Sequence, residues 1–278
     1  MNSLTKKIII YVLLALFGVL MIYPLLWVFS ASFKSNAEIF TTIGLIPSRF
    51  SFSAFAEGWK GTGQVTFGTY LKNSFLLVVP TVIFTILSCT LVGYGFARFQ
   101  FPFKGALFML MISTLMLPNA SIIIPRYIIF NKLGWLNTYL PFYIPAVLGC
   151  YPFFIFLMVQ FFRGIPKELE ESAYIDGCNS FVVLVRILLP LCKPAIISTL
   201  IFQFIWTWND FFNSLVYINS VTKYTMMLGL NTFIDATSKM NWNEVMAMSV
   251  VAMIPSIILF FLCQKYFVEG IATTGLKG

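Results

Sequence analysis

The chain has 278 residues, of which 59% are hydrophobic and only 10% are charged, and its mean hydropathy is +0.88. Soluble domains carry about 25% charged residues, so this composition excludes a soluble enzyme, a secreted module and a disordered tail. The class of protein that remains compatible with this composition is a polytopic membrane protein. The sequence contains no histidine, which excludes His-based catalysis, His metal sites and His proton relays.

Stretches without Asp, Glu, Lys or Arg mark the predicted membrane spans, because ionisable side chains are costly in hydrocarbon. The sequence contains six such stretches: five reach the about 20 residues of a membrane-crossing helix, and the sixth, 194–209, continues as an apolar run beyond Asp210 to about Ile218. None alternates like a β-barrel strand. They predict an all-α polytopic membrane protein with six transmembrane helices. The predicted segments are an N-terminal transmembrane helix at 1–34, an extracytoplasmic segment at 35–71, and a core at 72–278 with spans at about 73–97, 105–125, 139–162, 194–218 and 245–265 and a cytoplasmic loop at 163–193.

The placement of Lys and Arg predicts that both termini are cytoplasmic. In this orientation ten of the 18 basic residues lie in the shorter inside segments and eight lie in the longer outside segments. The ten are Lys6, Lys7, Arg98, Lys104, Arg163, Lys167, Arg186, Lys193, Lys265 and Lys277. Membrane topology thus explains the net charge of +8 without a nucleic-acid partner.

The cytoplasmic loop at 163–193 holds four of the ten acidic residues, a concentration that indicates a surface presented to a partner. Pro166 suits the first turn of a helix, and the three glutamates that follow would lie near the positive end of its dipole. Gly177 can adopt the left-handed conformation that ends a helix. The loop therefore begins with a predicted short helix over Glu168–Gly177.

A second short helix is predicted after Gly177. Asn179 or Ser180 can cap its amino end, and the helix would run from Phe181 to Leu189, where Pro190 would stop it. The whole loop is therefore predicted to be a helix–turn–helix on the cytoplasmic face.

This loop resembles the EAA loop of ABC importer permeases. The family pattern is Glu-Ala-Ala, three residues, Gly, nine residues, and then Ile-x-Leu-Pro. Here it stands as Glu171-Ser172-Ala173, Gly177 and Ile187-Leu188-Leu189-Pro190. Ser172 in place of the middle Ala is the only departure, and it exchanges one small residue for another.

The resemblance covers nearly the whole chain. The tail Gln264–Gly278 and the stretch Trp208-Asn209-Asp210-Phe211 are similar to carbohydrate importer permeases of the maltose-transporter type. The chain resembles the smaller of the two paired permeases, because the extra N-terminal spans of the larger subunit are missing. The resemblance implies the ABC type I importer permease fold.

The resemblance also implies a function. The chain would be the permease subunit of an ATP-driven importer of a sugar or oligosaccharide in a bacterial or archaeal cell (inner) membrane, and not itself an enzyme. Its partners would be a second homologous permease, two ATPase subunits, an extracytoplasmic solute-binding protein, the sugar and membrane lipid. No cofactor is expected on this chain, and ATP and Mg would bind the partner ATPase. The sequence agrees, since it contains no G-x-x-x-x-G-K-[ST] phosphate-binding loop.

By the same resemblance, the loop couples ATP hydrolysis on the partner to alternating access in the permeases. The first short helix would sit in a cleft of one ATPase, where small residues allow close approach and Glu171 would meet a basic partner. The alternative for Glu171, which the resemblance disfavours, is a surface carboxylate stabilised by the helix dipole. The residues expected to carry coupling are Glu171, Ser172, Ala173, Gly177, Ile187, Leu189 and Pro190.

A polar and aromatic cluster near the outer end of the fifth span is the candidate substrate path or gate. Sugars bind to aromatic platforms and to amide or carboxylate groups, which this cluster offers. Asp210 is the only ionisable residue in an otherwise apolar run, which favours a functional role. Two alternatives are open: the tryptophans anchor the helix at the interface, and Asp210 lies at the headgroups or bonds to the partner permease. The candidates are Trp206, Trp208, Asn209, Asp210 and Asn213.

Two other functional hypotheses compete with sugar import. The chain could be an ABC importer permease for a non-sugar solute, or an ion-coupled carrier, although carriers usually need more buried charges along their path. The outside segment 219–244, including Asp235, is expected either to touch the solute-binding protein or to be a solvated loop. The basic tail around Lys277 is expected either to reach the ATPase or to fray.

Overall fold

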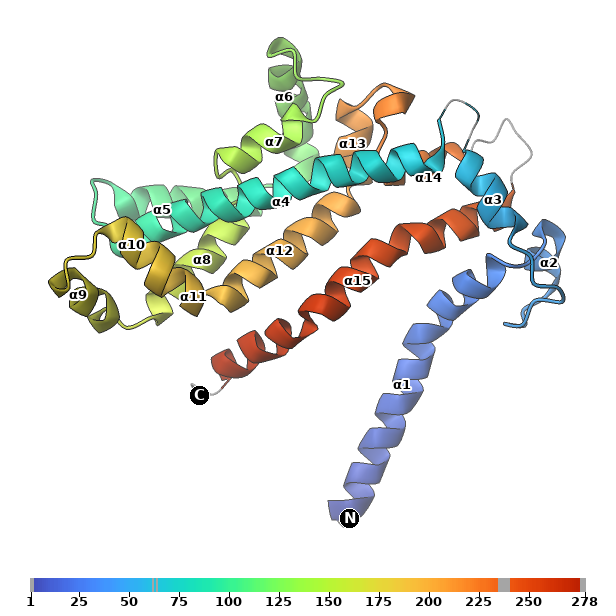
Figure 1. Ribbon diagram of the computed structural model, residues 1–278, viewed down its shortest axis with the longest axis horizontal. Helices are drawn as coiled ribbons and strands as arrows, with labels where there is room; N and C mark the ends of the chain where they lie inside the picture. Colours follow the sequence, from blue (N-terminus) through green and yellow to red (C-terminus); the bar gives the residue numbers. More distant parts are fainter. Residues whose placement is uncertain (1–2, 62, 64, 235–240, 276–278) are drawn as a thin grey trace. The chain divides into compact units, whose positions relative to one another are not determined.

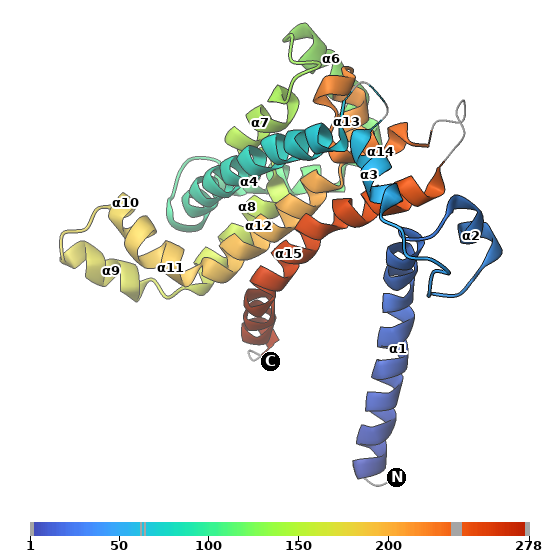
Figure 2. The same cartoon turned by 45° about the vertical axis from the view of Figure 1, so that its right-hand side comes forward.

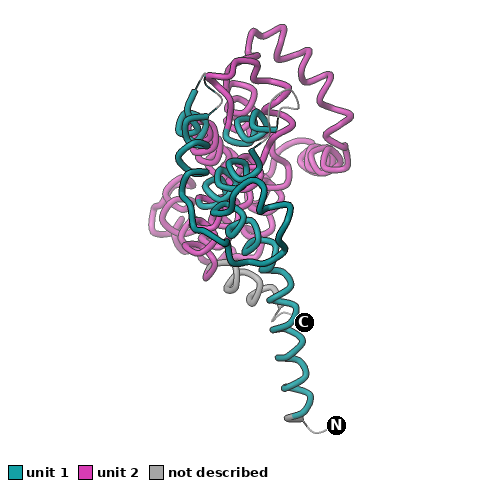
Figure 3. The backbone as a smooth tube through the Cα atoms, turned by 90° about the vertical axis from the view of Figure 1, so that its right-hand side faces the viewer, with its two compact units in different colours: residues 1–71, 226–254 teal, residues 72–225, 255–278 magenta. Residues whose placement is uncertain are grey.

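The structure is a computed structural model that describes residues 3–61, 63, 65–234 and 241–275, with only the backbone described for residues 3–4 and 266–275. Every regular element in these ranges is a helix, which confirms the all-α prediction (Figure 1). The roles expected of Asp235 and Lys277 fall outside the described residues. The chain divides into two compact units, residues 1–71 with 226–254 and residues 72–225 with 255–278 (Figure 3).

Among the described residues, four helices are long and apolar enough to cross a membrane, and two bent helix pairs raise the number to six if each pair is one span. The four are Thr5–Ala31, Phe67–Arg98, Leu140–Gly164 and Trp242–Lys265. The bent pairs are Lys104–Met116 with Asn119–Lys132, at 107°, and Ser180–Leu191 with Lys193–Trp208, at 77°. The chain is therefore a multi-pass membrane protein whose helices are in part broken.

The first unit contains the amino-terminal helix and the segments that follow it. Ser35 caps α2 by accepting a hydrogen bond from the Glu38 backbone N–H at 3.3 Å. The Glu38 carboxylate accepts bonds from the Ser48 backbone N–H at 2.7 Å and hydroxyl at 2.9 Å, which hold the pKa of this carboxyl below its ordinary value. The helices are α1 (Ser3–Ala31), α2 (Asn36–Thr41), α3 (Ser53–Lys60), α14 (Met226–Thr232), the start of α4 (Phe67–Arg98) and the first part of α15 (Trp242–Gly275).

The second unit contains most of α4 and every element from α5 to η3, with the last part of α15. Its helices α8 and α12 lie side by side in Figures 1 and 2. The elements are α5 (Lys104–Ser113), η1 (Thr114–Met116), α6 (Asn119–Lys132), α7 (Leu140–Val147), α8 (Pro152–Gly164), α9 (Glu168–Ile175), α10 (Ser180–Val183), η2 (Leu184–Leu188), α11 (Leu189–Leu191), α12 (Lys193–Trp208), α13 (Phe211–Tyr217) and η3 (Val221–Lys223).

The second unit has two ends that matter for function. In both Figure 1 and Figure 2, helices α9 to α11 lie near the end of α4 that carries Arg98, whereas α6, α7 and α13 lie together at the opposite end of the unit, above the middle and far half of α4. Asn137 joins the connections at that other end: its side-chain oxygen accepts the Ser220 backbone N–H at 3.0 Å. Asn73, near the start of α4, donates to the backbone oxygens of Thr222 at 2.9 Å and Tyr224 at 3.0 Å. Helix α4 therefore reaches from one end of the unit to the other.

Candidate functional site

The loop at 163–193 folds as the sequence predicts at its start. Helix α9 has acidic residues only in its first turn, where they complement the partial positive charge of the exposed backbone N–H groups. Gly177 has φ +83°, the left-handed conformation that a glycine adopts without strain, and the chain turns there. The Asn179 side chain then caps α10 by accepting the Val182 backbone N–H at 2.9 Å.

The second half of the loop differs from the prediction at Pro190. The sequence predicts that Pro190 stops the helix, but the chain remains helical through α11 to Leu191. Residues Leu184–Leu188 form a π-helical turn, in which the Leu189 backbone N–H donates to the Leu184 oxygen. The wider turn accommodates a proline ring that would clash inside a regular α-helix. The break therefore comes at Cys192, just before α12 begins at Lys193.

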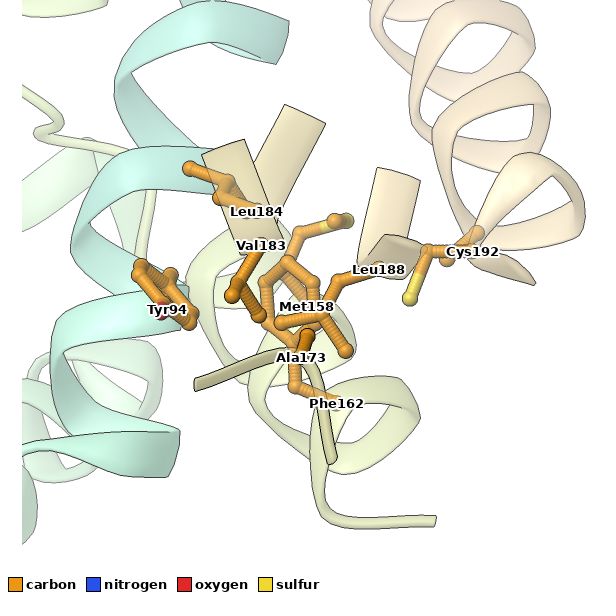
Figure 4. Packing of buried hydrophobic residues seen from close by; sticks show 9 residues of the cluster. Tyr94, Met158, Phe162, Ala173, Val183, Leu184, Leu188 and Cys192 are labelled. Atoms are coloured by element: carbon orange, nitrogen blue, oxygen red, sulfur yellow. The ribbon is translucent and has the colours of Figure 1, made fainter. Parts of the chain in front are cut away.

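A cluster of buried apolar side chains holds the loop against the membrane helices (Figure 4). Ala173 of α9 lies in this cluster, and Ile187 and Leu189 of the predicted motif pack against it while half-buried. These three motif residues therefore act inside the protein rather than at its surface. The buried members are Tyr94, Met158, Phe162, Ala173, Val183, Leu184, Leu188, Cys192 and Ala195.

The opposite side of the loop is open to solvent. Glu171, Ser172, Gly177 and Pro190 of the predicted motif are all exposed. They lie beside large apolar side chains that also point outward: the exposed fractions are 45% for Leu169, 87% for Ile175 and 67% for Phe181. A surface that combines small, acidic and apolar residues in this way is typical of a protein-binding site.

The sequence alone did not reveal the strongest electrostatic contact of the loop. Arg98, the last residue of α4, forms an ion pair with Glu170 of α9, and the two side chains are only 8% and 7% exposed. Arg98 also donates through Nη2 to the Ile165 backbone oxygen at 2.9 Å. Sequence spacing identifies Arg98 only as the end of an uncharged stretch, and no local signal links it to a residue 72 positions later.

At the other end of the unit lies a cavity of about 390 Å³ with polar and aromatic walls. Of the five residues predicted for a substrate path, Trp206, Asp210 and Asn213 line it. Its lining residues are Arg126, Phe130, Pro141, Phe142, Pro145, Cys150, Tyr151, Gln203, Trp206, Thr207, Asp210, Asn213 and Tyr217.

The other two predicted path residues lie elsewhere. Trp208 is 2% exposed and stacks on Phe204 with ring centroids 5.2 Å apart, so it belongs to the packed interior. Asn209 is exposed and uses its side-chain amide to donate to the Ile205 backbone oxygen at 2.9 Å, a bond that closes the end of α12. Neither residue is among those that line the cavity.

Asp210 is fixed at the start of α13. Its carboxylate accepts the Asn213 backbone N–H at 3.0 Å, which caps the helix, and the Asn213 side-chain amide at 2.9 and 3.1 Å. Trp206, which is 50% exposed, presents an aromatic face near it in the lining. The short break between α12 and α13 thus turns both a carboxylate and an indole towards the same space.

Arg126 is a second charged residue of the cavity, and sequence reasoning missed it. It lies in α6, the second half of a bent pair, and its charge attracts Asp210. The uncharged stretch at 105–125 makes Arg126 look like the boundary of a span, whereas the bend near Pro118 brings it into the unit. An arginine and an aspartate on one cavity give it both donors and acceptors of charge-assisted hydrogen bonds.

One buried polar atom of the lining, the Asn213 side-chain oxygen, has no hydrogen-bond partner, whereas the Tyr217 hydroxyl lies within reach of the Arg126 guanidinium. Tyr217 is 2% exposed, and its ring packs on Phe130 and Phe142. Leaving a buried polar atom unpaired costs about 1–3 kcal/mol, so such atoms indicate a site that a polar ligand or water completes. Within the described ranges, no group of three or more Cys, Asp or Glu side chains could hold a metal ion.

Comparisons with known proteins agree with this arrangement. A family model described as "Binding-protein-dependent transport system inner membrane component" matches residues 89–273, which include both the loop and the cavity. The solved structure of a bacterial ABC transporter involved in the import of the acidic polysaccharide alginate contains a chain with a TM-score of 0.83 and 25% sequence identity; the match covers 96% of this chain and 99% of that chain.

Individual relatives match over almost their whole length. The probable ABC transporter permease protein YurM of Bacillus subtilis is 35% identical over 97% of this chain and 88% of that protein. The trehalose/maltose transport system permease protein MalG of Thermococcus litoralis is 30% identical over 100% of this chain and 99% of that protein. The family resemblance is thereby confirmed, and the chain belongs to the family of inner membrane components of binding-protein-dependent transport systems, as a transport subunit and not a catalytic chain.

Proposed function

We propose that this chain is a permease subunit of an ATP-driven importer of a sugar or oligosaccharide, and that its cavity forms part of the sugar path. The observation that carries the proposal is the cavity, with an exposed indole and a buried side-chain oxygen that has no hydrogen-bond partner. A ring hydroxyl of a sugar would donate to the Asn213 oxygen, a second would bond to the Tyr217 hydroxyl, and the apolar ring face would lie on Trp206. The names of two relatives support this substrate class: one is a trehalose/maltose transport permease and another an arabinooligosaccharide transport permease.

The proposed path residues are Trp206, Asp210 and Asn213, together with Arg126 and Tyr217. Asp210 and Arg126 offer an acceptor and a donor, so they suit vicinal hydroxyl groups better than an apolar solute. Trp208 and Asn209 are left out of the proposed path because one is packed inside and the other closes a helix end.

The proposed coupling surface is the exposed side of α9, with Glu171, Ser172 and Gly177. Its exposed apolar neighbours Leu169 and Ile175 would be buried by an ATPase subunit, and Glu171 would meet a basic side chain there. The other motif residues would support this surface from inside the loop or next to it: Ala173, Ile187, Leu189 and Pro190. Closure of two ATPases on ATP and Mg²⁺, which bind those partners, would rotate this chain against a second homologous permease.

The proposed orientation places the coupling loop and both termini in the cytoplasm of a bacterial or archaeal cell. Arg163, Lys167, Arg186 and Lys193 all lie in or beside the loop, as the positive-inside rule requires of a cytoplasmic segment. An extracytoplasmic solute-binding protein would then deliver the sugar from the side of the membrane on which the connections beyond α6 and α13 lie.

Cys150 allows the sugar path to be tested, because it is exposed and lines the cavity. In the transporter complex with Cys178 and Cys263 replaced by serine, N-ethylmaleimide should label Cys150. Trehalose, maltose or diacetylchitobiose would be tested as protecting sugars. A bound sugar at about ten times its Kd should slow labelling about tenfold.

The matched control moves the reactive thiol out of the cavity, by combining Cys150→Ser with Leu148→Cys. Leu148 is 69% exposed and is not among the lining residues. Labelling there should not respond to sugar. Protection of both thiols alike, or protection of Cys150 by inorganic phosphate or glutamate instead of any sugar, would refute the proposed path. Co-purification of an ATPase with the wild-type chain tests the partner assignment separately.

A further inference from the structure

The buried ion pair between Arg98 and Glu170 is not accounted for by docking or by the sugar path. Glu170 and Glu171 are adjacent in sequence, yet α9 turns one carboxylate inward and the other to solvent. The inward one is nine-tenths buried and meets the end of α4. The helix thus separates two functions by one residue: Glu171 faces outward to a partner, and Glu170 faces the protein's own membrane helix.

Two further contacts reinforce the connection between α4 and the loop. The Tyr94 hydroxyl, one turn before Arg98, donates to the Ser180 backbone oxygen at 3.2 Å, at the start of α10. Arg98 itself donates to the Ile165 backbone oxygen where α8 ends. The last turn of α4 therefore contacts the loop at its entry, in its first helix and at the start of its second helix.

Helix α4 carries this connection across the unit. It contains 32 residues and is thus about 48 Å long. Its other end is bonded through Asn73 to the backbone of residues 222 and 224, in the connection that follows α13 and the cavity. A displacement of α9 that acts on Arg98 would therefore reach the neighbourhood of the cavity through one continuous helix.

We propose that Glu170 and Arg98 are positioning residues that transmit movement of α9 to α4. Neither residue touches the ATPase or the sugar in this proposal, which rests on the proposed function of the chain. A buried pair is suited to this task because each charge lacks solvent to replace its partner, so the two helices move together rather than slide apart. In an exposed pair, water would replace the partner of each charge, and the two helices would be free to move apart.

Glu170→Gln tests the proposal, because it removes the charge and keeps the size of the side chain. The matched control is Glu57→Gln, which removes the carboxylate of an exposed ion pair with Lys60 in α3. Each variant would be expressed with the complete transporter, and the amount of permease in the membrane, the co-purified ATPase, the ATP hydrolysis rate and the sugar uptake would be measured. We expect Glu170→Gln to assemble and hydrolyse ATP while uptake per ATP falls about fivefold or more. Glu57→Gln should leave all four quantities unchanged.

A double variant provides the readout that a purely structural role would not produce. Combining Arg98→Glu with Glu170→Arg restores opposite charges with exchanged positions, and it should regain part of the uptake per ATP that Glu170→Gln loses. Normal uptake per ATP in Glu170→Gln overturns the proposal, as does loss of uptake only in proportion to lost permease or lost ATPase. Absence of any ATPase with the wild-type chain would instead refute the proposed function, so the two failures are distinguishable.

Discussion

Gly93→Ala tests how closely α4 packs on α8, the helix that leads directly into the loop at 163–193. A Cβ atom at Gly93 would lie 2.7 Å from the Cβ of Met158. Two carbon atoms prefer a separation of about 3.5–4.0 Å, so this contact is strongly repulsive. Met158 is 1% exposed, and its Cβ is fixed to the backbone, so the helices themselves must separate to relieve the contact.

The expected cost follows from two opposing effects. Overpacking of this kind costs about 1–3 kcal/mol, whereas alanine in place of glycine in a helix returns about 0.8–1.0 kcal/mol. Gly95 of the same helix is the matched control, because a Cβ there meets nothing within 4 Å. Gly95→Ala keeps the helix gain without the clash. The difference between the two variants therefore isolates the overpacking cost.

Thermal unfolding of the purified protein in detergent, followed by circular dichroism, measures this difference. Each kcal/mol corresponds to about 2–4 °C for a chain of this size, so Gly93→Ala should unfold about 2–12 °C below Gly95→Ala. Equal midpoints, or a higher midpoint for Gly93→Ala, would show that α4 and α8 do not approach as described. That result would also weaken the argument that α4 and the loop move together.

Two further substitutions address the proposed roles of single residues. Gly177→Asp should leave the permease in the membrane but uncouple ATP hydrolysis from uptake. Gly134→Asp is its control, because the two glycines have similar positive φ angles, +83° at Gly177 and +70° at Gly134, and a Cβ at either position would meet open space. Both variants carry about 1–2 kcal/mol of backbone strain, so normal uptake in the first, or equal uncoupling in the second, would contradict the docking role. Asp210→Asn keeps a side chain that caps α13 well, but it leaves the charge of Arg126 uncompensated in the cavity. Sugar uptake by the reconstituted transporter should therefore fall about tenfold, which is equivalent to about 1.4 kcal/mol. Unchanged uptake would remove Asp210 as an ionic participant.

The sequence predicts features that depend on local chemistry. The uncharged stretches predict where apolar helices form, because each residue in them faces the same solvation cost. The start of α9, the left-handed turn at Gly177 and the cap by Asn179 involve partners within a few residues, so their spacing alone is informative. The same reasoning fails at Pro190, because one π-helical turn upstream changes the space available to the proline ring.

Features that depend on the path of the chain were not predictable in this way. Arg126 appears in the sequence as the end of an uncharged stretch, and only the 107° bend between Met116 and Asn119 places it in a cavity with Asp210. Trp208 and Trp206 are two residues apart and equally attractive as sugar platforms. The helix turns Trp206 to the cavity and Trp208 into the core, a rotation that short polar motifs do not specify.

Because this chain contains few charged residues, each charged side chain that faces inward is informative about function. A charge that leaves water needs a partner, and the second unit supplies one of opposite sign at each end: Glu170 with Arg98 beside the loop, and Asp210 with Arg126 in the cavity. The first pair is closed and nine-tenths buried, as a fixed connection between helices requires. The second lines the cavity beside the unpaired Asn213 side-chain oxygen, as the proposed binding and release of a polar solute requires. The second unit thus has a buried pair of opposite charges beside the loop and an accessible pair of opposite charges at the cavity, and α4 extends between them.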